Sequence, residues 1–308
     1  MEFYIVLRTV ATMLIYMIVG FSLIRLKLGD IDHAKTMSSL LIYICGPCMV
    51  INAFINMDFT VSNAMSLLEF FLASFFVQAL FFGVLYLIFR KKLEEARYRI
   101  LILGATLGNV GFLGLPLVTS IFPEEPIVAG YSSIYVMSMN LIVFTMGVFM
   151  LTKDKKYISM GAMVKNPTTI AILIALPFYI IDLNMPQIMT EGIWLLGKMT
   201  TPICMIVLGM RLAASDLKKV FVRPFVYASS MLKLVVFPLL AYGCVSLIPV
   251  FDNTFRVSIL VLSATPTAAI VLSMAEIHGC EQELSANAVL LATVFCIITL
   301  PLMVLVAG

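Results

Sequence analysis

Ten apolar stretches, most of them long enough to cross a bilayer, constrain this chain more than any other feature. An α-helical span needs about 20 apolar residues, and the stretches lie at residues 4–24, 35–56, 64–89, 100–121, 127–151, 166–182, 189–210, 223–248, 255–275 and 285–307. Hydrophobic residues make up 62% of the chain and charged residues 12%, with a mean hydropathy of +1.08. Soluble domains are nearer half apolar and a quarter charged. The sequence therefore predicts an all-α integral membrane protein with ten transmembrane helices.

Lysine and arginine are concentrated on one side of these expected spans. The loops after the first, third, fifth and seventh stretches hold 16 of the 20 basic residues, and the opposite loops carry only Arg256. Because basic loops stay in the cytoplasm, we expect a multi-pass protein of the plasma membrane, such as a bacterial inner membrane, with both termini outside. The net charge of +3 gives no indication of a nucleic-acid partner.

The fourth stretch contains a segment that weakens its own helix. Residues 108–117 read "GNVGFLGLPL", with three glycines, an asparagine and Pro116 at the centre of an otherwise apolar span. In lipid, each backbone group freed by such a break costs several kcal/mol unless another group satisfies it. The ninth stretch is also interrupted, by "TPT" at residues 265–267. Both breaks are therefore expected to be built into the structure and to be satisfied by other groups.

The two halves of the chain resemble each other. "RYRILILGATLGNVGFLGLP" (97–116) aligns with "FRVSILVLSATPTAAIVLS" (255–273), which places Ala264 159 residues after Ala105. Pro47 and Pro202, in the second span of each half, are 155 residues apart. Five spans in each half mean that the second copy enters from the opposite face. This predicts two inverted five-helix repeats, residues 1–154 and 155–308, with broken fourth and ninth helices that cross.

Inverted repeats with discontinuous helices are typical of secondary transporters, whose sites lie near the membrane midplane. The N-terminal ends of half-helices present free N–H groups and positive dipole ends, which suit a carboxylate. The expected binding residues at the crossing are Gly108, Asn109, Gly111, Thr265, Pro266 and Thr267. The threonine hydroxyls have a plainer alternative use, which is to bond a carbonyl of their own helix.

Three further polar residues lie within spans, where ionisable or amide groups are functional candidates. Lys233 is expected near mid-depth, where it would offset the charge of an anion, pair with an acid or bond the broken backbone. Lys198 would either reach the transport path or extend to the interface. Asn140 would bond a crossing backbone or contact a ligand directly.

Several motifs resemble the auxin efflux carrier family, in particular its bacterial malate- or malonate-permease-like members and the plant PIN-type carriers. They are "GNVGFLGLPL", "NPTTIAILIAL" (166–176), "TPICMIVLGMRL" (201–212), "LKLVVFPLL" (232–240) and "ATPTAAIVLSMAE" (264–276). The resemblance implies a scaffold of helices 1, 2, 6 and 7 that also forms a homodimer. It implies a transport domain of helices 3–5 and 8–10 that shifts as an elevator.

The same resemblance assigns positions in this sequence. The family's crossover asparagine corresponds to Asn109, and its crossover prolines correspond to Pro116 and Pro266. Glu69 is the nearest counterpart of an acidic residue in the third span of plant carriers, with a possible coupling or supporting role. The bile acid:sodium symporters are related in plan.

The function expected from these observations is secondary transport, by efflux, of a small organic carboxylate bound at the crossover. The alternatives are a sodium-coupled organic anion symporter that works in uptake, or an anion channel. The spans hold no paired carboxylates and no Ser/His arrangement for catalysis, so an enzyme is not expected. Six cysteines and two histidines without ligand spacing indicate no metal site and no cofactor.

Overall fold

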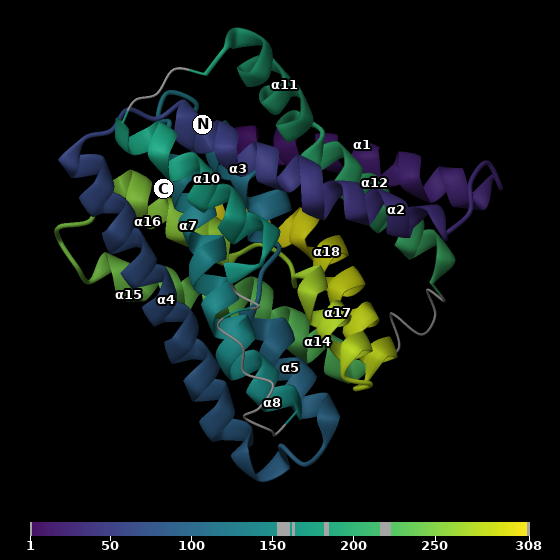
Figure 1. Ribbon diagram of the computed structural model, residues 1–308. Coiled ribbons are helices and arrows are strands. Elements are labelled where there is room, and N and C mark those ends of the chain that lie inside the picture. The colour runs from purple at the N-terminus through teal and green to yellow at the C-terminus, as the bar shows by residue number, and fades with distance from the viewer. Residues whose placement is uncertain (1, 153–160, 162–163, 182–184, 216–222, 307–308) are drawn as a thin grey trace.

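The computed structural model of the chain describes residues 2–152, 161, 164–181, 185–215 and 223–306, and within these ranges it contains helices and no strand. Figure 1 shows the helices packed into one bundle, with both chain ends at the upper left and the α4–α5 turn at the bottom. The predicted all-helical architecture is confirmed. The helices are α1 (Glu2–Arg25), α2 (His33–Leu40), α3 (Gly46–Ile55), α4 (Val61–Phe89), α5 (Ala96–Thr106), α6 (Leu115–Ile121), α7 (Ile127–Ile142), α8 (Val148–Thr152), α10 (Pro167–Ile181), α11 (Gln187–Lys198), α12 (Thr200–Ala214), α14 (Pro224–Met231), α15 (Phe237–Ser246), α16 (Asn253–Ser263), α17 (Ala269–Ile277) and α18 (Gln282–Val304).

Seven continuous helical segments of the described residues are long and apolar enough to cross a membrane. The other three expected spans have a different form. Residues 100–121 and 255–275 are each interrupted, as α5 with α6 and as α16 with α17, and α10 is a single helix of 15 residues. A length criterion for a continuous span therefore passes over the two broken stretches, because neither half-helix alone is long enough.

Short π-helical segments join several of these helices: η1 (Leu41–Cys45), η3 (Val110–Gly114), η4 (Val143–Gly147) and η6 (Leu232–Val236). Three of them end two residues before a proline, namely Pro47, Pro116 and Pro238. A proline ring inside a helix clashes with the carbonyl four residues earlier and lacks an N–H to bond it. The wider π turn gives the ring room. The sequence shows the prolines but does not by itself predict this response to them.

The helices form two packed groups. In one, α1 packs along α12, α2 also contacts α12, and α3 packs against α10 and α11; the other contains α4–α7 and α14–α18. The α1–α12 contact brings two backbones together, since a Cβ on Gly20 would lie 2.0 Å from the Ile206 carbonyl oxygen and one on Gly209 would lie 2.0 Å from that of Met17. Small residues permit this approach between membrane helices.

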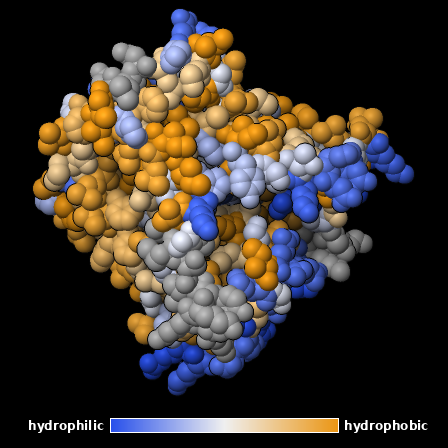
Figure 2. All heavy atoms as spheres, in the orientation of Figure 1, coloured by the Kyte–Doolittle hydropathy of each residue, from blue (hydrophilic) through white to orange (hydrophobic). Residues whose placement is uncertain are grey.

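The surface agrees with a membrane location. Figure 2 shows apolar residues over the upper left of the molecule and hydrophilic residues gathered at its right and lower edges. The lower edge holds the α4–α5 turn, where the 3-10 turn η2 (Arg90–Lys92) supplies three basic residues. Many large apolar side chains along α4, including Leu68, Leu72 and Phe76, are exposed. They form a face suited to lipid.

Candidate functional site: the crossing of two broken helices

The breaks in the fourth and ninth expected spans meet each other. Gly108 and Thr267 form an isolated antiparallel β-bridge, flanked by two backbone hydrogen bonds. The Asn109 N–H donates to the Pro266 carbonyl at 2.7 Å, and the Ala268 N–H donates to the Leu107 carbonyl at 3.0 Å. Each break thus supplies a donor and an acceptor to the other. Within lipid this pairing replaces helical hydrogen bonds that would otherwise be lost.

The pairing has an internal regularity. Gly108 and Thr267 are 159 residues apart, the separation at which the two halves of the sequence align. At that separation Leu107 corresponds to Pro266 and Asn109 corresponds to Ala268. The two flanking hydrogen bonds therefore join equivalent positions in reciprocal order, as a local two-fold axis through the bridge requires.

Only glycine fits at position 108. A Cβ there would lie 2.5 Å from Thr265 Oγ1 and 2.9 Å from Lys233 Nζ. In a non-hydrogen-bonded antiparallel pair, opposed Cα atoms approach to about 4.5 Å, which leaves little room for side chains beside the bridge. The expected role of Gly108, a close backbone approach, is thus met by protein atoms.

Lys233 lies beside the crossing in η6, where its side chain is 0% exposed. Its Nζ donates to the Ser263 carbonyl at 2.7 Å and lies 4.6 Å from the centroid of the Phe237 ring. Ser263 is the last residue of α16, so its carbonyl has no helical donor, and a cation there also complements the helix dipole. Of the roles expected for Lys233, bonding the broken backbone is the one that its geometry supports.

The threonines of the second break are engaged with backbone groups. Thr267 Oγ1 donates to the Gly104 carbonyl at 2.9 Å, and Thr265 Oγ1 donates to the Leu262 carbonyl at 2.8 Å. Both side chains are buried. These residues therefore use their only hydroxyl donors to hold the crossing together.

A cavity of about 290 Å³, here called the crossover cavity, lies against the crossing. Four of the expected site residues line it: Gly108, Asn109, Gly111 and Asn140. No Asp, Glu, Lys, Arg or His is among the described residues that line it. Thr265, Pro266, Thr267 and Lys233 lie outside the lining, which also includes α3 on the opposite wall.

Both half-helices begin at this cavity. Residues 110–112 and residues 269 and 270 are the first of η3 and α17, and all of them line it. The N–H groups of a first helical turn have no acceptor within the helix. Each helix N-terminus is equivalent to roughly half a positive charge. The two ends together therefore provide about one positive charge without any cationic side chain.

Two amide side chains in the crossover cavity have unused capacity. Asn109 is 9% exposed, and its Nδ2 makes only a long bond of 3.9 Å to Cys204 Sγ within the described residues. Sulfur is a weak acceptor. Asn140 is 3% exposed, and its buried Nδ2 has no hydrogen-bond partner in the described chain. Because an unsatisfied buried donor costs about 1–3 kcal/mol, a ligand that accepts from Asn140 would recover that energy.

Other polar residues of the cavity were not predicted from the sequence. Asn166 and Thr168 lie at the start of α10, and Ser132 and Ser133 lie on α7. Asn166 caps α10, since its Oδ1 accepts from the Thr168 N–H at 3.0 Å. The "NPTT" motif signals such a cap, because asparagine before proline commonly starts a helix. Nothing in the sequence, however, indicates that the cap faces the crossing.

Lys198, Pro116 and Glu69 lie elsewhere. Lys198 and Pro116 line a second cavity of about 300 Å³, the lysine cavity, enclosed by α3, α6, α11 and α12. Pro116 leaves the Phe112 carbonyl without its helical donor, and Thr201 Oγ1 donates to that carbonyl at 3.3 Å. Glu69 lies in α4 and lines neither cavity, but its carboxylate is near enough to Tyr131 to interact with it electrostatically.

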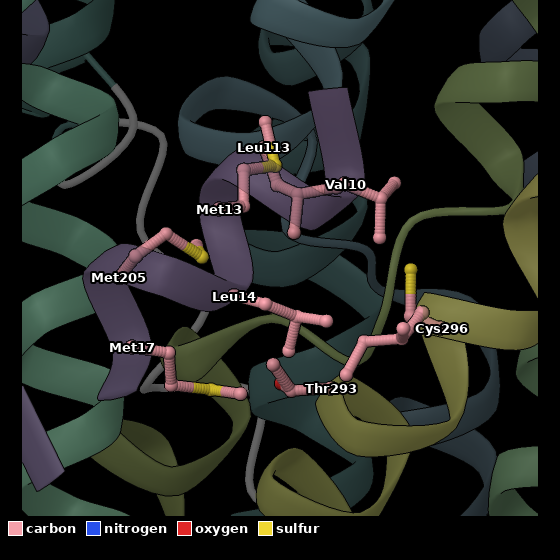
Figure 3. A pocket seen from close by; sticks show the side chains of 9 residues that line it. Val10, Met13, Leu14, Met17, Leu113, Met205, Thr293 and Cys296 are labelled. Atoms are coloured by element: carbon pink, nitrogen blue, oxygen red, sulfur yellow. The ribbon is translucent and has the colours of Figure 1, made fainter. Parts of the chain in front are cut away.

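A third cavity is too small for an organic ligand. Figure 3 shows it between α1 and α18, with Met13, Met17 and Met205 among its lining side chains. Its volume is about 20 Å³, which is room for about one water molecule. Methionine is adaptable and fills irregular gaps between elements. The cavity marks a methionine-rich seam between the two packed groups of helices.

Comparison with known proteins decides the family. The profile of a family described as membrane transport protein matches residues 5–163 and 157–304. The chain belongs to the membrane transport protein family. This family of auxin efflux carriers and malate-permease-like proteins is the one that the sequence motifs indicate, so that prediction is confirmed. It is a family of transporters and not of enzymes.

A relative extends this result along most of the chain. A protein of Methanocaldococcus jannaschii, described as an uncharacterized transporter, is 27% identical over 280 residues. The match covers 88% of this chain and 89% of the relative. This membrane transport protein is therefore similar to the archaeal protein over nearly the full length of both.

Proposed function

We propose that this membrane transport protein is a secondary transporter of a small organic carboxylate, which binds in the crossover cavity. One observation carries the proposal. Two half-helix N-termini and the unused amides of Asn109 and Asn140 converge on one cavity whose described lining holds no anionic side chain. Fixed dipoles of this kind are suited to a negative charge because they need little reorganisation to receive it.

The cavity also favours one kind of carboxylate. Opposite the amides stand apolar side chains, among them Met49, Val50, Phe112 and Ile270. A substrate with one carboxylate and an apolar body would place each part against matching groups. A second carboxylate would find no cation among the described residues of this lining, and burying an unpaired charge is costly. We therefore propose a monocarboxylate in preference to a dicarboxylate.

The architecture proposed for transport is ten membrane helices in two inverted repeats, residues 1–154 and 155–308. The reciprocal hydrogen bonds at a separation of 159 residues support this, as do the two stretches, 5–163 and 157–304, that match the family. The broken stretches and α10 would then complete the seven continuous spans. In this arrangement the crossing lies close to the membrane midplane.

The movement proposed is an elevator-like shift. The group of α4–α7 and α14–α18 would carry the substrate past the group of α1–α3 and α10–α12, and the latter would hold a homodimer together. The methionine-rich seam in Figure 3 supports such sliding, because thioether side chains repack at little cost. Binding between two such groups would let each face of the membrane reach the site in turn.

The direction proposed is export from the cytoplasm. The basic loops place both chain ends outside, and the protein would lie in a plasma membrane. Moving one negative charge outward along the membrane potential gains about 2.3 kcal/mol per 100 mV. A monocarboxylate therefore needs no coupled ion for export.

The test is binding of a panel of carboxylates (malate, malonate, succinate and an indole acid) by purified protein, measured by calorimetry. We expect saturable binding, tighter for the indole acid than for succinate. Asn109→Ala should weaken it about tenfold or more, because it removes a hydrogen bond to a charged group. Counterflow in proteoliposomes, which a channel does not support, should show the same loss.

The matched control is Asn287→Ala. Asn287 is also a buried asparagine whose Nδ2 has no partner in the described chain, but it lines neither the crossover cavity nor the lysine cavity. Its replacement should leave carboxylate affinity unchanged. Equal binding by wild type and Asn109→Ala, or no binding of any acid, would remove the crossover cavity as the carboxylate site.

A further inference from the structure

Three cavities adjoin one another from the crossing to the far ends of α3 and α11. The crossover cavity and the lysine cavity share Met49 and Leu115 in their linings. The lysine cavity in turn shares Asn52 and Trp194 with a third cavity of about 330 Å³. This third cavity, here called the surface cavity, reaches Asn56 at the end of α3. The row therefore traces a route that continues beyond the crossing.

Lys198 has a special place on this route. Among the described residues that line the three cavities, it carries the one positive charge. Its Nζ lies 3.6 Å from the centroid of the Trp194 ring, which holds the ammonium group at the cavity wall. No carboxylate of the described chain lies within ion-pair distance of it. Its charge is therefore available to an anion in the lysine cavity.

Neutral polar groups surround the same space. Asn52, Thr119 and Thr201 line it with Lys198. Asn52 Oδ1 accepts from Asn56 Nδ2 at 3.1 Å, which fixes the side chain of Asn52. The Thr201 hydroxyl makes only the long bond of 3.3 Å to Phe112. An ammonium group, an amide and a hydroxyl around one cavity are the groups that bind a carboxylate.

We propose that the lysine cavity is a second carboxylate-binding station, separate from the crossover cavity, in which Lys198 binds the anion and Trp194 lies beside it. This inference rests on the proposed function, because it adds a second station to the same route. The two stations differ in chemistry. The crossover cavity offers fixed dipoles and amides, whereas the lysine cavity offers a full charge partly exposed to water. A substrate leaving the crossing would be received at Lys198 before it reaches the surface cavity.

Trp194 is the only tryptophan in the 308 residues, so intrinsic fluorescence reports on this cavity alone. The experiment titrates the purified protein with butyrate, which does not fluoresce, and follows Trp194 emission. We expect a saturable change in the wild type. Lys198→Gln should raise the apparent Kd about tenfold, as expected for loss of a charged hydrogen bond, and Lys198→Arg should retain binding.

Two further variants decide the interpretation. Arg8→Gln removes an exposed positive charge of α1 that lines none of the three cavities, and it should titrate as the wild type does. Asn109→Ala should keep the Trp194 response although it loses binding at the crossing. The proposal is overturned if butyrate leaves the emission unchanged, or if Lys198→Gln titrates as the wild type does. It is also overturned if Arg8→Gln weakens binding as much as Lys198→Gln does, or if Asn109→Ala abolishes the response. A Trp194 response that depends on Lys198, together with unchanged flux in Asn109→Ala, would keep this station while removing the proposed crossover site.

Discussion

The two breaks at the crossing share a backbone arrangement but differ in their side chains. Each donates one N–H to the other and accepts one in return, at Asn109 and Pro266 and at Ala268 and Leu107. In the first break, however, the polar side chain faces the crossover cavity with almost no protein partner. In the second, the threonine hydroxyls bond to backbone carbonyls within the bundle.

This difference indicates a division of work between the two breaks. The second break uses its polar atoms to fix the position of the crossing, and Lys233 adds to this by bonding the end of α16. The first break can then leave Asn109 free without losing its own conformation, because its backbone is held by the partner segment. Substitutions in the second break and beside it should therefore act on stability, whereas substitutions of Asn109 should act on binding.

The largest effect on stability is expected at the point where the breaks touch. Gly108→Ala places a Cβ 2.5 Å from Thr265 Oγ1, and overpacking of this kind costs about 1–3 kcal/mol or more. We expect a loss of about 3 kcal/mol in unfolding free energy, measured by denaturant titration in mixed micelles. Gly111→Ala is the matched control, because its Cβ would meet only Val136 at an ordinary 3.5 Å. Equal stability of the two variants would contradict a tight crossing.

A smaller loss is expected when the lysine beside the crossing is replaced. Lys233→Met keeps the apolar stem but removes the donor to the Ser263 carbonyl. An unsatisfied buried acceptor costs about 1–3 kcal/mol, so the same titration should show a loss of about 2 kcal/mol. Lys91→Met, at the exposed α4–α5 turn, serves as the control. A variant at least as stable as the wild type would show that desolvation of the ammonium group outweighs its hydrogen bond.

The smallest loss separates the two breaks most clearly. Thr267→Val preserves shape but removes the hydroxyl that bonds to Gly104. A neutral hydrogen bond contributes about 1 kcal/mol, so unfolding free energy should fall by about that amount. Carboxylate affinity measured by calorimetry should stay within about twofold of the wild type, in contrast to Asn109→Ala. A tenfold loss of affinity in Thr267→Val would mean that the second break also contacts the substrate.

Much of the fold could be predicted from the sequence because burial in lipid leaves few alternatives. Long apolar stretches predict helices, and the glycines and prolines of residues 108–117 and 265–267 predict where two of them break. The helical architecture and the family are confirmed by the structure and by the comparisons. The π segments before Pro47, Pro116 and Pro238 were not predicted, because proline marks a disturbance of the helix without specifying how the chain absorbs it.

The candidate site could be predicted only in part. The sequence identified Gly108, Asn109, Gly111 and Asn140, which line one cavity, and it grouped Lys233 and Lys198 with them. The structure separates these two lysines: one is buried at the end of α16, and the other lies in the lysine cavity beside Trp194. A residue's depth along a helix can be counted from sequence, but the face that it presents depends on neighbouring helices.

The sequence by itself determined that this protein is a helical transporter with two interrupted spans, because hydrophobicity, length and helix-breaking residues are local properties. Only the tertiary structure decided that the two breaks pair with each other, that Thr265, Thr267 and Lys233 are used within the crossing, and that Asn109 and Asn140 remain available. These outcomes depend on contacts between segments about 160 residues apart. Whether a polar group has a partner is a property of the packed molecule, and no local pattern encodes it.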